Sequence, residues 1–300
     1  MRITLKQLAI FEAIARTGQV AKAAQQVSLS APATSMALAE LEKQLDARLF
    51  ERIGNKLRLN AQGSLLLPLA TEAIQKVDQI EHLFSAPNQS LHGTLNVAAS
   101  STIGNFLLAK SSVAFCQQHV GVKVDLNIDN TQAVIDSVLE FGSEIGFIEG
   151  DCVDSRLNVH PWHQDNLLVF CHPAHPLAGK TVAPADLNDQ YWVMRESGSG
   201  TREYFIRNAN ALGMRLQERF SFSTPEAIKQ AVKQGAGLAV LSELTVQKEI
   251  SRKELSLIEV EGLALSRQFY QIRHKSRHCS ALSDAFVEFC QRANQRNEAN

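Results

Sequence analysis

Apolar residues recur at helical spacing through the N-terminal part of the chain. In LKQLAIFEAIARTG, residues 5–18, one apolar face ends at Gly18, which predicts a first helix. VAKAAQQV, residues 20–27, predicts a short second helix whose small alanines permit close packing. In SLSAPATSMALAELEKQL, Ser30 is suited to cap a longer third helix, with Pro32 in its first turn. Helices joined by such a tight turn form a helix-turn-helix, whose later helix can enter the DNA major groove.

The start of the third predicted helix and the segment after it carry residues suited to nucleic acid. Ala33 and its neighbours are small, so they permit close approach to base edges or phosphates. LFERIGNKLRLN predicts two short strands around a Gly-Asn turn, a wing with three cations that can reach phosphates. A helical hairpin with solvated charges is the alternative. The candidate DNA-binding residues are Ser30, Pro32, Ala33, Thr34, Ser35, Arg52, Lys56 and Arg58.

A heptad pattern follows over residues 61–88. Its apolar positions step by 4, 3, 4, 3 and 4 and are Leu66, Ala70, Ala73, Val77, Ile80 and Phe84. The pattern predicts one long linker helix that pairs with a second copy of the chain, although packing on its own domain is the alternative. Pro68 should bend this helix, and the segment from Pro87 to Gly93 should end it.

Strand-like and helix-like segments alternate from residue 93 to the end. TLNVAAS, KVDLNIDN and EIGFIEG predict strands separated by helices, and the alternation continues through LLVFCHP, YWVMRE, LAVLSEL and SRQFYQIRH. This predicts an α/β domain with largely parallel sheets. Ligands bind such sheets beyond the carboxyl ends of the strands, where helix N-termini offer free N–H groups. Hydroxyl and amide side chains gather at those ends, and Thr224 would cap one of the helices.

The loop RESGSGTRE, residues 195–203, is suited to a small anion because it combines hydroxyls, glycines and flanking arginines before a helix. A flexible loop is the alternative. The loop lacks the G-x-x-x-x-G-K-[ST] pattern of a phosphate-binding P-loop and the G-x-S-x-G pattern of a hydrolase. CHPAHP offers three metal ligands without a distant fourth. We therefore predict no catalytic residues, metal or cofactor, and an enzyme or a simple small-molecule-binding protein is the rival class.

Charge and composition add two expectations. Residues 1–60 carry nine Lys/Arg against five Asp/Glu, while the whole chain has a net charge of −1. A basic head on an acidic body predicts that the head alone meets a polyanion. The five cysteines are odd in number and share no close spacing, and neither a signal peptide nor a long apolar run is present. We expect a reduced, cytoplasmic protein with no membrane partner.

The first 65 residues resemble the winged helix-turn-helix of LysR-type transcriptional regulators. The resemblance covers the three predicted helices, the wing and LNAQG without a gap. One departure is Ala31, where the family usually has a Gln that contributes to DNA contact, so base preference should differ here. Asn60 replaces a common Thr and still caps the next helix. The resemblance implies a head over residues 1–60.

The rest of the chain resembles the LysR effector domain. This implies two Rossmann-like α/β subdomains, about 93–163 with 269–300 and about 164–268, with a ligand cleft between them. ASSTIGNFLL, GFIEG and RESGSGTRE are similar to a narrower group that senses small anions, notably sulfur oxyanions such as sulfite. The candidate effector-binding residues are Ser100, Ser101, Thr102, Asn130, Glu149, Arg195, Ser197, Ser199, Thr201, Arg202 and Thr224. A carboxylate among them needs an explanation: Glu149 either pairs with Arg195 or Arg202, or stays protonated.

The expected protein is therefore a ligand-responsive regulator with an α-helical winged head, a linker helix and an α/β effector domain. Its expected partners are double-stranded DNA, a small anion, RNA polymerase and other copies of itself, as a dimer and then a homotetramer. An organic acid or an amino-acid-derived metabolite is the alternative effector.

Overall fold

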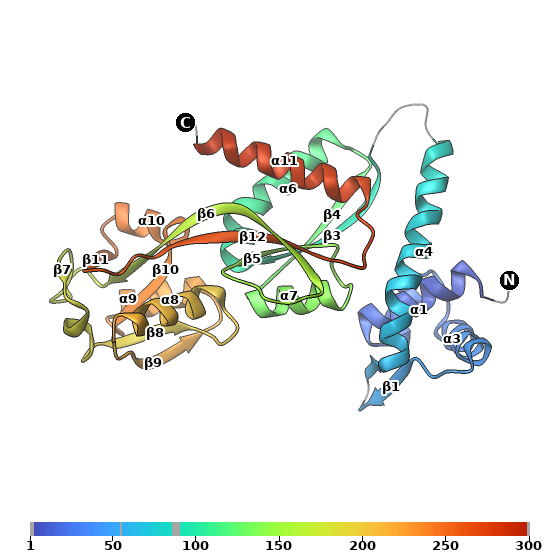
Figure 1. The fold of residues 1–300 in the computed structure, drawn as a ribbon, viewed down its shortest axis with the longest axis horizontal. Helices are drawn as coiled ribbons and strands as arrows, with labels where there is room; N and C mark the ends of the chain where they lie inside the picture. Colours follow the sequence, from blue (N-terminus) through green and yellow to red (C-terminus); the bar gives the residue numbers. More distant parts are fainter. Residues whose placement is uncertain (1–2, 55, 86–90, 299–300) are drawn as a thin grey trace.

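A small helical head, one long helix and an elongated two-part body follow one another along the chain (Figure 1). The computed structural model describes residues 3–54, 56–85 and 91–298. The predicted fold class, an α/β body behind a winged helical head, is confirmed.

The head holds three helices and a two-stranded wing. Its elements are α1 (Leu5–Thr17), α2 (Val20–Gln26), α3 (Ala31–Leu45), β1 (Phe50–Ile53) and β2 (Lys56–Leu59). A capping box between Thr4 and Gln7 starts α1, and Gly18 ends it with φ 65°, a conformation that glycine adopts readily. Ser30 caps α3, as predicted, by accepting the Ala33 N–H. The apolar faces of the helices share one core with Leu49 and the wing.

The linker helix is α4 (Ala61–Ser85), and it runs through Pro68 without ending. Its first turns pack on α1, so part of the predicted seam needs correction. Ala70 is 1% exposed within the head core, and Leu66 packs there as well. Among the α4 side chains that the structure describes, the large apolar ones left exposed are Leu65, Leu69 and Ile80. The predicted seam position at Phe84 lies outside the side chains that the structure describes.

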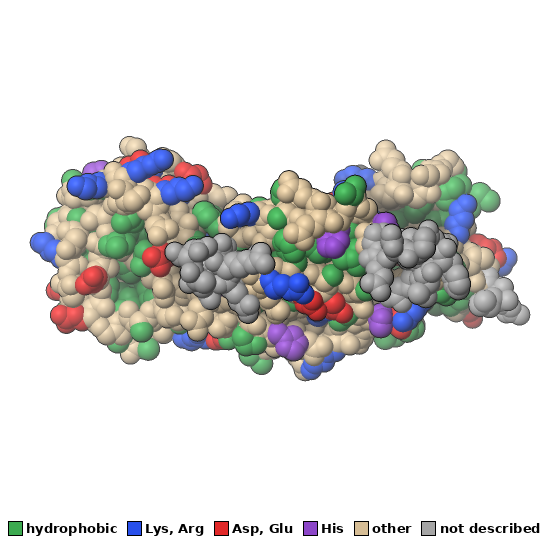
Figure 2. All heavy atoms as spheres, turned by 90° about the horizontal axis from the view of Figure 1, so that it is seen from above, with side chains coloured by type: hydrophobic (Ala, Val, Ile, Leu, Met, Phe, Trp, Pro, Cys, Tyr) green, Lys and Arg blue, Asp and Glu red, His purple; other side chains and the backbone are tan. Residues whose placement is uncertain are grey.

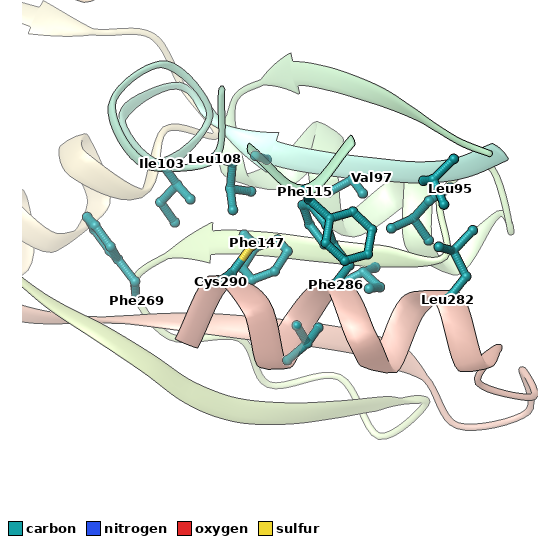
Figure 3. Packing of buried hydrophobic residues seen from close by; sticks show 14 residues of the cluster. Leu95, Val97, Ile103, Leu108, Phe115, Phe147, Phe269, Leu282, Phe286 and Cys290 are labelled. Carbon is teal, nitrogen blue, oxygen red and sulfur yellow. The ribbon is translucent and has the colours of Figure 1, made fainter. Parts of the chain in front are cut away.

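The body consists of two subdomains. Subdomain I contains β3 (Gly93–Ser100), α5 (Ser101–Ile103), η1 (Gly104–Leu108), α6 (Ala109–Gln118), β4 (Val122–Asp129), α7 (Thr131–Leu139), β5 (Ile145–Glu149) and α11 (Ala281–Glu298). Figure 3 shows its core, where Phe115, Phe147 and Phe286 meet between α6, the sheet and α11. The predicted helix after β3 is interrupted by η1, a π-helical stretch, beside the carboxyl edge of the sheet.

Subdomain II lies at the far end of the molecule from the head (Figure 1). It contains β7 (Thr181–Val182), η2 (Pro184–Leu187), β8 (Tyr191–Arg195), α8 (Gly200–Ala211), β9 (Gln217–Phe222), α9 (Pro225–Lys233), β10 (Leu238–Ser242), α10 (Glu243–Ser251) and β11 (Ser256–Val260). The short strands β7, β9 and β11 were not predicted, because their sequences lack a clear alternating apolar pattern.

Two long strands, β6 (Leu157–Cys171) and β12 (Ser266–His274), join the subdomains. Residues 157–166 of β6 pair with β12, and residues 167–170 pair with β10, so one strand passes from one subdomain to the other. The strand order is β4-β3-β5-β12-β6-β10-β8-β9. Pairing is parallel, as predicted, among β3, β4 and β5 and among β8, β9 and β10, but β6 and β12 run antiparallel to their neighbours. The sheets are therefore mixed rather than largely parallel.

The head contacts subdomain I directly. Phe141, which follows α7 with φ 58°, packs against the head core. Arg277 donates hydrogen bonds of 3.0 Å to the carbonyl oxygens of Phe141 and Ser143. Lys76 Nζ of α4 also lies 3.4 Å from His278 Nε2. One end of α7 thus lies against the head.

Candidate functional site

A cleft of about 570 Å³ separates the two subdomains at the carboxyl ends of β3, β4 and β8. Its lining is Ser101, Asn105, Phe106, Ile128, Asp129, Asn130, Glu196, Ser223, Thr224, Pro225, Glu226, Lys229 and Thr245. Asn130 caps α7 and Thr224 caps α9, each by accepting a backbone N–H. Two helix N-termini therefore face this cleft, an arrangement that favours an anion.

A buried cation lies beside the cleft. β8 ends at Arg195, whose side chain is 2% exposed. Its Nε and Nη2 atoms are 2.7 and 2.8 Å from the two carboxylate oxygens of Glu196, and Nη2 is 3.5 Å from Ser101 Oγ. The Glu196 side chain is 22% exposed and lines the cleft. Arg195 thus contacts both subdomains, and in the described part of the chain its one ion-pair partner is Glu196.

Glu149 accepts hydrogen bonds from both subdomains. The Thr102 N–H donates to its Oε1 over 2.9 Å, and the Thr201 hydroxyl donates to its Oε2 over 2.8 Å. Arg267 Nη1 lies 2.9 Å from the same Oε2. The partner of Glu149 is therefore Arg267, which was not among the predicted alternatives. Thr102 and Thr201, two of the predicted effector donors, are engaged by this carboxylate.

Arg267 belongs to a buried ionic network between the subdomains. Its guanidinium, fully buried on β12, also lies 2.7 Å from Asp165 on β6, and Ser242 donates to Asp165 over 2.7 Å. Burial alone would raise the pKa of Glu149, but the Arg267 charge and the Thr201 hydrogen bond outweigh burial and lower that pKa to about 2. Burial dominates at Asp165, whose pKa is raised even beside Arg267. Glu149 is thus ionised at neutral pH.

One sequence signal could have revealed Arg267. It shares the inward face of β12 with Phe269 and Gln271, because side chains two residues apart lie on the same side of a strand. A charged residue at such an inward-facing position needs a buried partner of opposite charge.

Arg202 requires a correction. Its Nη1 donates to the Arg195 carbonyl over 2.9 Å, and its Nη2 lies 2.7 Å from Glu218 on β9. The side chain therefore turns toward β9 and does not line the cleft.

The remaining predicted effector residues are spread over three environments. Ser100 and Ser199 are buried, and the Ser100 hydroxyl oxygen has no hydrogen-bond partner among the described residues. Ser197 and Glu149 line a second hollow of about 570 Å³, which also includes Asp151 and Arg207. The cleft itself therefore contains only three of the predicted residues, Ser101, Asn130 and Thr224.

Gly200 lies in close contact with the other subdomain, where a side chain has no room. A Cβ added there would lie 1.9 Å from the Glu149 carbonyl oxygen and 2.7 Å from Thr131 Oγ1. The Gln132 N–H also donates to the Gly198 carbonyl over 3.1 Å. Glycine at position 200 thus lets α8 touch β5 and α7 of the other subdomain.

The head presents a second candidate surface. Ala31, Pro32, Ala33, Ser35 and Met36 are exposed along α3. Thr34 needs correction, since it is fully buried and donates to the Ser30 carbonyl over 3.0 Å, so its side chain cannot contact DNA.

The wing forms as predicted around Gly54. Its three cations, Arg52, Lys56 and Arg58, are all exposed on the β1–β2 ribbon. On the face of the molecule drawn in Figure 2, by contrast, Lys/Arg and Asp/Glu side chains are interspersed over the body without a band of one sign.

Comparison with known proteins decides the family. Residues 5–64 match the bacterial regulatory helix-turn-helix protein, lysR family, and residues 88–295 match the LysR substrate binding domain. The chain belongs to the LysR family. It is similar to the HTH-type transcriptional regulator YeiE of Escherichia coli, with 35% identity over 294 residues that cover 98% of this chain and 99% of that one. LysR-type proteins are ligand-responsive transcription regulators, and the similar proteins are named as regulators rather than enzymes.

Two solved structures are similar in fold to this LysR chain. Full-length OxyR from Pseudomonas aeruginosa shares the fold, with a TM-score of 0.78 and 18% identity, covering 98% of this chain and 95% of that one. The CcmR regulatory domain of Synechocystis, solved in complex with 2-PG, has a TM-score of 0.64 and 26% identity, covering 68% of this chain and 98% of that domain.

In residues 3–54, 56–85 and 91–298, no three His, Cys, Asp or Glu side chains are grouped to hold a metal ion. No helix in the described part of the chain is long and apolar enough to cross a membrane.

Proposed function

We propose that this cytoplasmic LysR-type regulator senses a small oxyanion, with sulfite or a related sulfur oxyanion as the first candidate. The single observation that carries the proposal is Arg195, a buried cation beside Ser101 at the cleft. An anion there would gain charge-assisted hydrogen bonds in a poorly hydrated setting. The α7 and α9 N-termini add further favourable potential.

Binding of the anion would change the angle between the subdomains, because residues of both subdomains line the cleft. The anion would act through its different affinity for the two arrangements. Helix α7 offers a route to the head: its first turn meets subdomain II through Gln132, and Phe141 at its other end packs on the head core. A shift of subdomain II would therefore reach the head through one short, rigid element.

We further propose that two heads read two half-sites of a pseudo-palindromic operator. The exposed apolar side chains of α4, Leu65, Leu69 and Ile80, would pair with a second copy. Two dimers would then form a tetramer that bends DNA and recruits RNA polymerase according to the effector state.

A small organic acid is the second candidate effector. The cleft of about 570 Å³ has more room than a single inorganic oxyanion needs, and it also contains the apolar side chains of Phe106 and Ile128. The complex of the CcmR regulatory domain with 2-PG supports an organic anion.

Calorimetric titration of the full-length protein tests the proposal. The panel would contain sulfite, sulfate, thiosulfate, phosphate, 2-phosphoglycolate and small carboxylates, all at one ionic strength. We expect saturable binding of one anion, weakened about tenfold in Ser101→Ala through loss of one hydrogen bond to a charged group. Saturable binding that Ser101→Ala leaves unchanged would place the anion elsewhere, and absence of binding by the whole panel would contradict the anion sensor.

A further inference from the structure

We propose that Glu196 is a built-in competitor of the anionic effector. Its carboxylate occupies the Arg195 guanidinium, and the effector binds by displacing it. This inference rests on the proposed anion-sensing function and adds a residue that controls the affinity of its site for anions.

The geometry of the pair supports competition. Arg195 and Glu196 meet side by side through two hydrogen bonds of 2.7 and 2.8 Å, the planar two-bond geometry that a guanidinium also offers to an oxyanion. An effector with two oxygens in one plane could therefore take over both bonds without moving Arg195. The Arg195 guanidinium is the fixed half of the pair, because it is 2% exposed.

Glu196 is the half that can move. Its side chain is 22% exposed at the cleft, and no side chain other than Arg195 bonds to it in the described part of the protein. Its backbone N–H donates to the Phe222 carbonyl over 3.2 Å, so rotation of the side chain need not disturb β8. Glu149 is the opposite case, because it is buried and held by Thr102, Thr201 and Arg267.

Two hydroxyls could receive the incoming anion. Ser101 Oγ lies 3.5 Å from Arg195 Nη2, so an anion on the guanidinium would lie close to it. Thr245 lines the same cleft and is 4% exposed, and its Oγ1 has no hydrogen-bond partner among the residues that the structure describes. A buried hydroxyl without a partner is unfavourable, so a ligand that satisfies it gains affinity.

Displacement of a carboxylate lowers the affinity of every anion for Arg195 by the same factor, so only strongly attracted anions bind measurably. A monoanion that replaces Glu196 exchanges one negative charge for another at Arg195 and gains little. A dianion brings one more negative charge to the same position. It therefore keeps a net attraction to Arg195 after the Glu196 side chain has rotated into the solvent. Measurable binding is therefore expected for doubly charged oxyanions rather than for monoanions such as nitrate or acetate.

The test is Glu196→Gln in the full-length protein, titrated calorimetrically with sulfite, sulfate, thiosulfate, phosphate, nitrate and acetate at constant ionic strength. Glutamine keeps the shape of the side chain but removes the charge. We expect the anion that binds the wild type to bind the variant about tenfold more tightly, because a charge-assisted competitor has been removed. Nitrate and acetate should gain affinity by about the same factor, because Glu196 competes equally with every anion at Arg195.

Whether Glu196→Gln raises or lowers the anion affinity distinguishes a competing role of Glu196 from a structural one. If Glu196 only holds Arg195 in place, the variant binds the same anion equally or more weakly, and this inference is overturned. Glu218→Gln is the matched control: Glu218 pairs with Arg202 at 2.7 Å on the same subdomain but away from the cleft. It should change affinity less than twofold, and a tenfold gain in this control would show a general charge effect and overturn the inference.

The titrations distinguish failure of the proposed anion sensing from failure of the proposed competition by Glu196. An anion that binds the wild type but gains nothing in Glu196→Gln contradicts the competitor and leaves the anion sensor standing. Absence of binding in both proteins, each with a cooperative thermal transition, contradicts the anion sensor itself and the competitor with it. Binding that appears only in the variant supports the competitor role of Glu196 and contradicts anion sensing by the wild-type protein.

Discussion

Replacing Arg267 by methionine is expected to destabilise the protein by about 3–5 kcal/mol, as removal of one partner from a buried ion pair does. Arg267 is fully buried between Glu149 and Asp165, so the variant leaves two carboxyl groups without their shared cation. Methionine fills most of the volume, which separates the charge effect from a cavity effect. Chemical denaturation at neutral pH measures the loss.

The stability lost in Arg267→Met should depend on pH. In the folded protein the pKa of Glu149 is about 2, below its ordinary 4.5, so its stabilising contribution is fully present above pH 4.5 and lost as pH falls toward 2. Without Arg267, burial raises the pKa of Glu149 and the carboxyl becomes neutral. The cost of Arg267→Met should therefore decrease as pH is lowered from about 7 to about 4.

The matched control is Arg292→Met, because Arg292 pairs with Glu288 at 2.8 Å on the exposed surface of α11. This change should cost less than about 0.5 kcal/mol. Equal losses in the two variants, or a cost of Arg267→Met that grows at low pH, would contradict the role assigned to the buried network.

Neutralising the wing is expected to give the largest change in DNA binding. In Arg52→Ala/Lys56→Ala/Arg58→Ala, three exposed cations are removed from the β1–β2 ribbon. If each contacts a phosphate, the slope of log affinity against log salt becomes shallower by about 0.9 per contact, or about 2.7 in total. The affinity at moderate salt should fall more than about a hundredfold, at about 1 kcal/mol per contact. Fluorescence anisotropy on one duplex at several salt concentrations measures both quantities.

A triple change on the body controls for net charge. Lys180, Lys248 and Lys253 are exposed lysines of subdomain II, and their replacement by alanine removes the same charge far from the head. The salt slope should then stay at the wild-type value. A wing variant with a wild-type slope would show that the ribbon does not touch phosphates.

The elements of the head were predictable because local signals determine them. Gly18 ends α1, Ser30 caps α3, and Gly54 lies between the paired strands of the wing. The alternation of strands and helices likewise gave the fold class of the body. These signals depend on residues that are close together in the chain, so they can be recognised from the sequence alone.

Features that depend on distant packing were missed. Thr34 lies on the same helix as Ser35, yet it is buried and Ser35 is exposed, and only the packing of α1 to α3 decides this. Ala70 fits a heptad seam but faces α1. The Glu149–Arg267 pair joins residues more than a hundred positions apart, and its formation depends on the crossing of β6 and β12.

Measuring DNA affinity with and without the bound anion tests whether the cleft and the head are coupled. A fluorescent duplex would be selected by the full-length protein from a random pool, and the anion would be held at a concentration that calorimetry shows to be saturating. We predict that the anion changes DNA affinity by about 5–150-fold, and that DNA changes anion affinity by the same factor. Equal DNA affinity with the cleft saturated would contradict the coupling of cleft and head.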